Sequence, residues 1–375
     1  MLTLMEMKKF EQKKKIALLM GGRSGEHEVS LVSATSIYKN LDASRFDIFP
    51  IGIAKNGAWY LIEAPQDHSF SLFKICENEK NRLVPLLEPR KDGLHLIFAS
   101  EKNRELVVDI IFPMIHGTFG EDGCLQGLLE FSEIPYVGAD VVAAGIAIDK
   151  GLAKRVVYES GIAIPKFQIF KKPDASILEK VFKFPLFVKP SRTGSSVGIR
   201  KVVRLEELES AMRYAFRFDD QVLVEQAIDG REIELSVLEN SKYGEPPRVS
   251  LPGEIVLKRE FYSYEAKYLE EDAAELQIPA RLTSEQVKKA QETARKIFEV
   301  MACQGYARVD LFLGRQDGVF YFNEINTIPG FTKISMFPKL WEASGIPYRQ
   351  LLTELVDLAV LRWERKKKLI REWKD

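Results

Sequence analysis

The chain has 375 residues, of which 46% are hydrophobic, enough for two or three domains with sizeable cores. Its 54 basic and 54 acidic residues give zero net charge, which excludes the basic footprint of a nucleic-acid-binding protein. Three cysteines without C-x-x-C spacing argue against structural zinc and for a reducing compartment, and no signal peptide or membrane span is recognisable, so a cytoplasmic protein is expected.

The chain opens with the elements of a doubly wound α/β domain. A short apolar strand at 16–20 runs into a glycine turn at 21–25, and a helix is expected from 26 to 41. This order is typical of an open parallel sheet with helices on both faces. Further elements are expected as strands at 46–53 and 107–114, hairpins and loops between 56 and 104, and helices at 125–132 and 139–159.

The first glycine-rich turn ends in an acidic residue. Glycines after a strand let backbone N–H groups approach an anion at a helix start. The spacing Gly-Gly-x-x-Gly at 21–25 departs, however, from the G-x-G-x-x-G pattern of dinucleotide sites. Glu26 follows at once and would repel a pyrophosphate, whereas it suits an ammonium group. The turn therefore indicates a small cationic or zwitterionic ligand.

A second glycine-rich segment, residues 189–198, follows an apolar strand expected at 184–188. It contains the G-x-S-x-G pattern of a nucleophile elbow, with Ser196 at its centre. That hydrolase fold places its histidine after the serine, yet all four histidines of this chain precede Ser196. The favoured reading is a hydroxyl- and glycine-rich flap over nucleotide phosphates, with Lys189 as a point charge on the preceding strand.

Acidic and amide side chains near the C-terminal end fall on two strands expected to form a hairpin. A three-residue loop at 316–318 would place Asp310 opposite Glu324. The same register places Arg308 opposite Asn326 on the same face, whereas a two-residue loop would turn the carboxylates apart. Such oxygen donors suit Mg²⁺, which completes its shell with phosphates and water. Taken alone, the pattern fits a solvated polar face as well as a metal site.

Seven motifs in order along the chain are similar to those of the D-alanine–D-alanine ligases, a family of the ATP-grasp superfamily. They run from Gly-Gly-x-Ser-x-Glu-His-Glu-Val-Ser at 21–30 through 116–123, 149–150, 189–198, 265–268 and 308–310 to Asn-Glu-Ile-Asn-Thr-Ile-Pro-Gly-Phe-Thr at 323–332. Any one of them is weak, whereas seven in the family's order are specific. The resemblance is poorest at 1–14, at 55–102 and after Trp363.

The resemblance implies an ATP-dependent ligase with a three-domain ATP-grasp fold. ATP would phosphorylate the carboxylate of one D-alanine, and the amine of a second would attack the acyl phosphate to give a dipeptide for peptidoglycan synthesis. Two Mg²⁺ ions, with Mn²⁺ as an alternative, are implied as cofactors, and a homodimer as the assembly. The implied domains are an N-terminal substrate domain at 1–138, a central domain at 139–224 and a C-terminal catalytic domain at 225–375, with ATP between the last two.

The resemblance also implies roles for individual residues. The implied metal ligands are Asp310, Glu324 and Asn326. The implied ATP contacts are Lys150, Lys189, Ser196, Glu225, Glu232 and Lys267. The implied catalytic groups are Glu26, Ser195 and Tyr268, which close the site, and Arg308 with the backbone N–H of Gly330, which stabilise an oxyanion. The implied substrate-binding residues are His116, Ser335 and Met336, the last through its backbone only.

Tyr268 carries the prediction of the second substrate. Related ligases that make depsipeptides typically have phenylalanine here, so the tyrosine favours an amine as the second nucleophile. The surrounding loop, about 258–272, is expected to close over the site and exclude water. A ligase that takes D-serine or D-lactate is the alternative within the superfamily. A serine hydrolase built on Ser196 and a non-catalytic nucleotide-binding protein are alternatives from other classes.

Overall fold

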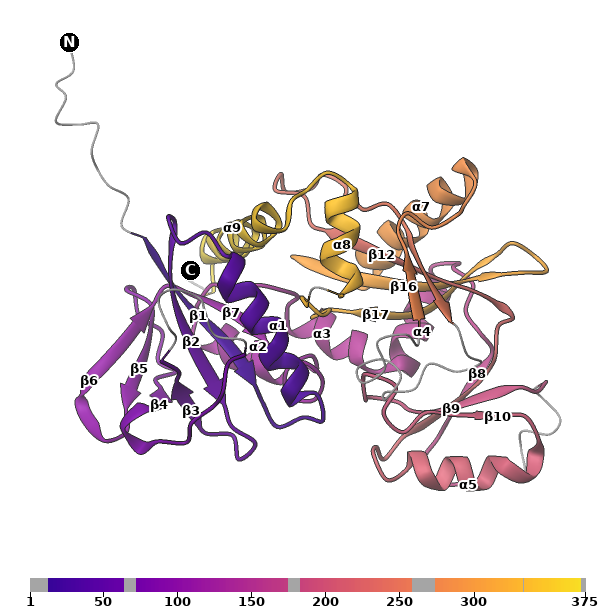
Figure 1. Cartoon of the computed structure of the whole chain (residues 1–375), viewed down its shortest axis with the longest axis horizontal. Coiled ribbons are helices and arrows are strands. Elements are labelled where there is room, and N and C mark those ends of the chain that lie inside the picture. The colour runs from indigo at the N-terminus through magenta and orange to yellow at the C-terminus, as the bar shows by residue number, and fades with distance from the viewer. Residues whose placement is uncertain (1–12, 64–71, 175–182, 258–273, 333, 372–375) are drawn as a thin grey trace, which may run out of the picture.

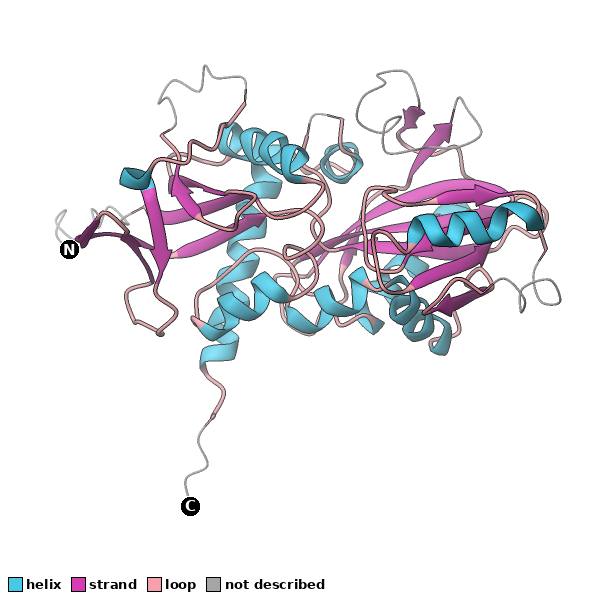
Figure 2. Cartoon of the chain, turned by 90° about the horizontal axis from the view of Figure 1, so that it is seen from below, coloured by secondary structure: helices cyan, strands magenta, loops and turns pink. Residues whose placement is uncertain are grey.

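Three sheets follow one another along the chain in the computed structural model, which describes residues 13–63, 72–174, 183–257, 274–332 and 334–371. A seven-stranded sheet comes first, followed by sheets of four and six strands. Figure 1 shows the first sheet on the left and the other two on the right. In Figure 2, which looks from below, the strands form two separate groups at the two ends of the molecule. The expected α/β class is confirmed.

The N-terminal sheet begins as a parallel α/β unit. Helix α1 (His27–Asn40) joins β1 (Lys14–Gly21) to its parallel neighbour β2 (Phe46–Ile53), and β7 (Ile110–Met114) pairs in parallel with β1 on its other side. An antiparallel meander extends the sheet through β3 (Trp59–Leu61), β4 (Arg82–Pro85), β5 (Leu94–Phe98) and β6 (Glu101–Val108). The strand expected at 107–114 is therefore the end of β6 followed by β7.

Alternating apolar residues on β1 explain why both faces of this sheet are covered. Leu18 points to the face where α1 and the C-terminal helix α9 (Tyr348–Lys367) pack, and Leu19 points to the face where α2 (Cys124–Phe131) packs. Because helices cover both faces, the expected doubly wound arrangement is confirmed. None of the helices in the described part of the chain is long and apolar enough to cross a membrane.

Two helices, α3 (Val141–Ile148) and α4 (Lys150–Glu159), occupy the segment that was expected to form a single helix. Asp149 separates them with an extended backbone, and its Oδ1 accepts hydrogen bonds from the N–H groups of Gly151 and Leu152, each at 3.0 Å. A carboxylate at this position satisfies N–H groups that have no partner within the helix. The first residue of α4 is thereby placed at the edge of a cleft.

The four-stranded sheet is antiparallel. Its strands, in spatial order, are β10 (Arg200–Val202), β9 (Leu186–Pro190), β11 (Val222–Gln226) and β8 (Phe167–Phe170). Helix α5 (Leu205–Ala215) covers one face, where Leu208 and Met212 pack against Val188 and Val224. The other face carries Lys189 and turns towards the cleft.

The six-stranded sheet lies opposite. Its strands are β12 (Gly230–Leu238), β13 (Arg248–Val249), β14 (Gly253–Leu257), β15 (Ala274–Gln277), β16 (Tyr306–Gly314) and β17 (Phe320–Asn326). Helix α7 (Ser284–Val300), which begins with a capping box at Thr283, packs with α3 and α4 on its apolar face. A short helix, α8 (Met336–Ala343), follows β17, and the 3₁₀ turn η1 (Glu79–Asn81) precedes β4.

Candidate active site

One large cleft, with a volume of about 1500 Å³, lies between the sheets. Its walls come from the start of α1, from β9 and β11 of the four-stranded sheet and from β12, β16 and β17 of the six-stranded sheet. The described candidate residues that line it are Glu26, His116, Lys150, Lys189, Ser195, Ser196, Glu225, Glu232, Arg308, Asp310, Glu324, Asn326, Gly330, Ser335 and Met336. The two remaining candidates, Lys267 and Tyr268, and the expected closing loop lie outside the described residues.

The β16–β17 hairpin has the expected pairing at its inner end but a different turn. Asp310 lies opposite Glu324 and Arg308 lies opposite Asn326, as expected. The N–H of Gly314, however, donates to the carbonyl of Val319 at 2.9 Å, so the loop comprises residues 315–318, with Gly318 at a φ of 67°. The prediction of a three-residue loop is therefore wrong, although Gly318 does take the left-handed conformation.

A β-bulge restores the predicted pairing beyond this turn. Leu311 pairs with Phe322 whereas Asp310 pairs with Glu324, so Asn323 is an extra residue on β17. Phe322 packs in the core, whereas the next two residues, Asn323 and Glu324, line the cleft. A turn that is one residue longer than predicted and an unpredicted bulge thus cancel at the candidate metal ligands.

Lys154 on α4 supports this bulge from the buried side. Its Nζ donates to the carbonyl of Asn323 at 2.9 Å and lies 3.1 Å from Oε2 of Glu225, which also pairs with Lys189. Burial by itself would raise the pKa of Glu225, but the two ammonium groups outweigh it and lower the pKa to about 2. Sequence analysis missed Lys154, and its spacing of four from Lys150 on one helix face was the available signal.

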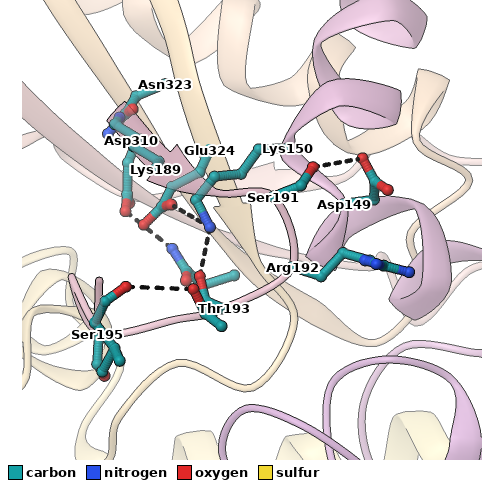
Figure 3. Close-up of polar contacts among 12 residues, drawn as sticks. Asp149, Lys150, Lys189, Ser191, Arg192, Thr193, Ser195, Asp310, Asn323 and Glu324 are labelled. Carbon is teal, nitrogen blue, oxygen red and sulfur yellow. Dashed lines mark hydrogen bonds and ion pairs between the residues drawn. The ribbon is translucent and has the colours of Figure 1, made fainter. Parts of the chain in front are cut away.

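Lys150 and Lys189 reach the cleft from different elements. In Figure 3 the side chain of Lys150 extends between Thr193 and Glu324. Its Nζ donates to the Thr193 carbonyl at 2.6 Å and lies 3.9 Å from Oε2 of Glu324. Lys189, on β9, pairs with Glu225. Two ammonium groups beside carboxylates form a suitable environment for the phosphates and cation of a metal–nucleotide complex.

Asp310 is the centre of a polar network on the opposite wall. Arg308 donates from Nε and Nη2 to its two carboxylate oxygens, each at 2.7 Å, and Asn326 donates from Nδ2 to Oδ2 at 2.9 Å. Oε2 of Glu234 lies 3.1 Å from Nε of Arg308. Within the described part of the chain, Nη1 of Arg308 and the amide oxygen of Asn326 have no hydrogen-bond partner. Both residues line the cleft, so both groups are available to a ligand.

The donor set of this wall fits a hard divalent cation. Asp310, Glu324 and the amide oxygen of Asn326 supply oxygen atoms only, which is the ligand chemistry of Mg²⁺. Among the described residues, no group of three His, Cys, Asp or Glu side chains could hold a metal ion by itself. Few protein carboxylates are what Mg²⁺ requires where phosphate oxygens and water complete its octahedral shell.

Two loops close on the carboxylate of Glu26. Oγ of Ser195 donates to its Oε1 across a sequence separation of 169 residues. A Cβ at Gly117 would lie 2.5 Å from Oε2 of Glu26, and a Cβ at Gly194 would lie 2.9 Å from it. Any side chain at either glycine would displace the carboxylate. These glycines therefore let both loops approach the acid that the sequence assigns to an ammonium group.

Ser195 and Ser196 form the centre of a β-turn between β9 and β10. Their φ angles are 51° and 59°, and the N–H of Val197 donates to the Gly194 carbonyl at 3.1 Å. Left-handed φ at a non-glycine residue costs about 1 to 3 kcal/mol and is often found at functional sites. A nucleophile elbow joins a strand to a helix, whereas this turn joins antiparallel strands. The hydrolase alternative is therefore excluded.

His116 uses both ring nitrogens on protein groups. Nδ1 lies 2.9 Å from the carbonyl oxygen of Ile328, and Nε2 lies 3.1 Å from Oγ of Ser33. Because a carbonyl can only accept, Nδ1 carries a proton, and in the neutral ring Nε2 then accepts from the Ser33 hydroxyl. The ring lines the cleft, but these contacts tie it to the segment after β17 rather than leaving a nitrogen for a ligand.

Ser335 and Met336 lie at the start of α8. Oγ of Ser335 accepts from the N–H of Thr332 at 2.9 Å. The side chain of Met336 packs with Ile255 and Leu340 in a small apolar cluster. Its backbone is therefore the part that remains for a ligand, in line with the expectation from the sequence.

Two family patterns cover most of the chain. The pattern described as the N-terminus of D-ala D-ala ligase matches residues 15–139, and that described as its C-terminus matches 156–357. The D-alanine–D-alanine ligase of Oceanobacillus iheyensis is 43% identical over 371 residues, which covers 95% of this chain and 98% of that protein.

Solved structures extend the same likeness to three dimensions. The VanG D-Ala:D-Ser ligase of Enterococcus faecalis matches with a TM-score of 0.79 and 36% identity, over 93% of this chain and 100% of that chain. The D-alanine–D-alanine ligase of Bacillus anthracis, solved with ATP, matches with a TM-score of 0.70 and 26% identity, over 94% and 99%. This chain belongs to the D-alanine–D-alanine ligase family.

Proposed function

We propose that this protein joins two D-alanine molecules to D-alanyl-D-alanine, converts ATP to ADP and phosphate, and so supplies peptidoglycan synthesis. The observation that carries the proposal is the gathering of every described candidate residue around one cleft, where lysines and an arginine lie beside carboxylates. The intact set of lysines, acids and Arg308 along this cleft argues against a nucleotide-binding protein without catalysis.

In the first half-reaction, a carboxylate oxygen of one D-alanine attacks the γ-phosphorus of ATP, and the bond to ADP breaks. Lys150 and Lys189 stabilise the phosphate charge, and Lys267 has the same proposed role. Glu225 and Glu232 hold the adenine and ribose side, and Ser196 lies in the phosphate flap. Two Mg²⁺ ions, or Mn²⁺, held by Asp310, Glu324 and Asn326 would neutralise the developing charge.

In the second half-reaction, the amine of the other D-alanine attacks the acyl carbon. The carbon–oxygen bond to phosphate then breaks, and phosphate leaves with the electron pair and takes up the proton that the nitrogen loses. Nη1 of Arg308 and the N–H of Gly330 stabilise the oxyanion between these events. Glu26 holds the ammonium group of the first substrate, and Ser335 with the backbone of Met336 holds the carboxylate of the second.

The decisive test is phosphate release from ATP by the purified protein with and without D-alanine, together with analysis of the product. We expect release only with D-alanine, and D-alanyl-D-alanine as the product. Release of phosphate at the same rate without any D-alanine would contradict the proposal, as would rapid turnover of the L-isomer alone.

A ligase with D-serine as second substrate is the other candidate, because the VanG D-Ala:D-Ser ligase is among the similar structures. Equal concentrations of D-alanine and D-serine should give mainly D-alanyl-D-alanine if the main proposal holds. Tyr268→Phe should raise the share of depsipeptide when D-lactate competes with D-alanine at neutral pH. An unchanged ratio of dipeptide to depsipeptide would remove Tyr268 from specificity.

We also propose the domain division at 1–138, 139–224 and 225–375, a homodimer and a cytoplasmic location. The three sheets support the division, since each falls largely within one of these ranges. Light scattering on the purified protein tests the assembly, and a mass of one chain at micromolar concentration would contradict the dimer.

A further inference from the structure

We propose that Glu121 and His116 act together as a clamp on Ile328, and that this clamp positions the N–H of Gly330 for the second half-reaction. Both residues come from the loop after β7, whereas Ile328 follows β17 at the other end of the chain. Glu121 has no role in the proposed chemistry so far. The inference rests on the proposed function, because Gly330 is assigned there to the oxyanion.

The clamp holds Ile328 on both of its backbone polar groups. The N–H of Ile328 donates to Oε1 of Glu121 at 3.2 Å, and its carbonyl accepts from Nδ1 of His116 at 2.9 Å. Oε2 of Glu121 in turn accepts from the N–H of Gly117 at 2.8 Å, which fixes the carboxyl group within its own loop. Side chains of Glu121 and His116 are 9% and 4% exposed, so water does not compete freely for these bonds.

Ser33 on α1 supplies a third attachment to the same segment. Its Oγ accepts from the N–H of Phe331 at 3.4 Å while its hydroxyl proton goes to Nε2 of His116. The proton directions agree throughout, since each nitrogen or hydroxyl donates towards an oxygen or ring nitrogen that can accept. Glu121, His116 and Ser33 therefore hold Ile328 and Phe331 through one connected network of hydrogen bonds.

These attachments lie on both sides of Gly330 and leave little freedom between them. Only Pro329 and Gly330 separate Ile328 from Phe331. Proline fixes its own φ near −65° and offers no N–H group, so the direction of the Gly330 N–H follows from where the two anchors hold the backbone. Phe331 is itself fully buried against Phe112 and Tyr306.

The charge state of Glu121 suits a structural partner more than a second counter-ion. Burial first, and then the neighbouring charge of Glu26, raise the pKa of Glu121 to about 8. Glu324 adds to the same effect. The N–H groups of Gly117 and Ile328 act the other way on this pKa, because each binds one oxygen of the ionised carboxylate.

Two substitutions of His116 separate the clamp from direct substrate contact. Asn can place its amide nitrogen where Nδ1 lies and donate to the Ile328 carbonyl, whereas Leu, of similar size, cannot. We expect dipeptide formation to fall about 100-fold in His116→Leu, the scale of a misplaced catalytic group, and less than about 10-fold in His116→Asn. Equal loss in the two variants would overturn the clamp.

Acyl phosphate formation, the first half-reaction, serves as a second readout. General damage to the fold would lower it together with dipeptide formation. Exchange of ¹⁸O between the β,γ-bridging and the non-bridging β positions of ATP reports acyl phosphate formation without the second step. We expect the ratio of dipeptide formation to exchange to fall about 100-fold in His116→Leu and less than about 10-fold in His116→Asn, because the oxyanion forms only after the acyl phosphate. A parallel fall of exchange and dipeptide formation would overturn the proposal.

Glu121→Gln tests the hydrogen bonds that Glu121 accepts. It also keeps the proposal testable if His116→Leu does not fold. Its amide has one acceptor oxygen, so one of the two N–H bonds is lost. We expect about a 10-fold fall in dipeptide formation with exchange preserved, while the control Glu133→Gln, just after α2 and away from the cleft, changes neither. Unchanged dipeptide formation in Glu121→Gln would contradict the clamp. Failure of the proposed function is distinguishable, because the wild type would then show no exchange that depends on D-alanine.

Discussion

The two ends of the cleft are built on different physical principles. At the amino-acid end, around His116 and Glu121, side chains hold the backbone of Ile328 through directional hydrogen bonds. At the phosphate end, around Glu225 and Asp310, buried acids pair with Lys154, Lys189 and Arg308. The first arrangement fixes the position of a backbone segment, whereas the second gathers charged groups along the wall of the cleft.

This difference follows from the ligands that each end is proposed to hold. A small zwitterion is positioned by a few polar groups of fixed geometry, and a misplaced group costs rate rather than binding. A triphosphate carries several negative charges that must be neutralised, and charge-assisted hydrogen bonds are about twice as strong as neutral ones. Substitutions that remove charge should therefore affect the two ends differently.

The largest effect is expected for Glu324→Gln at the phosphate end. The change keeps the size of the side chain but removes a candidate metal ligand, and we expect turnover to fall at least about 100-fold. Because the Glu324 side chain is 32% exposed, the melting temperature should stay within about 3 °C. Mn²⁺ binding followed by electron paramagnetic resonance gives a readout that does not depend on turnover. Glu285→Gln, on the first turn of α7, is the control.

Normal turnover with normal Mn²⁺ affinity in Glu324→Gln would refute the metal assignment. It would also break the comparison between the two ends, because charge would then not be what the phosphate end supplies.

Lys154→Met should have the largest effect on stability. The substitution leaves Glu225 buried with one ammonium partner and the Asn323 carbonyl without its donor, and breaking such a buried pair costs about 3 to 5 kcal/mol. Urea unfolding measures the loss. Lys288→Met, whose lysine side chain is 79% exposed in a surface pair, should cost less than about 1 kcal/mol. Similar losses in both variants would show that the buried network contributes little.

Buried carboxyl groups at the two ends should give opposite dependences of stability on pH. The pKa of Glu225 is lowered from the usual 4.5 to about 2, so its contribution is present above pH 4.5 and is lost as pH falls towards 2. That displacement corresponds to about 3 kcal/mol. The pKa of Glu121 is raised to about 8, so its contribution is present below pH 4.5 and is lost as pH rises through 8.

Urea unfolding between pH 2.5 and 9 checks this pair of slopes. Glu225→Gln should flatten the acid side of the profile, and Glu121→Gln should flatten the side above pH 4.5. If one substitution flattened both sides of the profile, or if neither flattened the side assigned to it, the assignment of the two slopes to Glu225 and Glu121 would be wrong.

The smallest effect is expected for Gly318→Ala at the tip of the hairpin. A methyl group would meet no atom within 4 Å, so the only cost is the φ of 67°. We expect a loss of about 1 kcal/mol in the free energy of unfolding and no change in turnover. A clear loss of turnover would mean that the turn, rather than the bulge at Asn323, sets the register at Asp310.

Local pattern accounts for most of what sequence analysis predicted correctly. The strand expected at 46–53 is β2 itself, and the helix expected at 26–41 differs from α1 by one residue at each end. Apolar alternation, glycine turns and helix periodicity act over a few residues, so they can be read directly from the chain. The break at Asp149 was missed because its capping carboxylate lies within an otherwise continuous helical pattern.

The sequence by itself determined the family, the order of the motifs and the residue types that line the cleft, because these depend on residue identity and spacing along the chain. The tertiary structure alone decided the bulge at Asn323, its support by Lys154, and the hold of Glu121 and His116 on Ile328. Those features join residues that are between 11 positions apart, from Leu311 to Phe322, and 212 positions apart, from His116 to Ile328. Which distant groups meet depends on how whole sheets and helices pack, and no local preference specifies it.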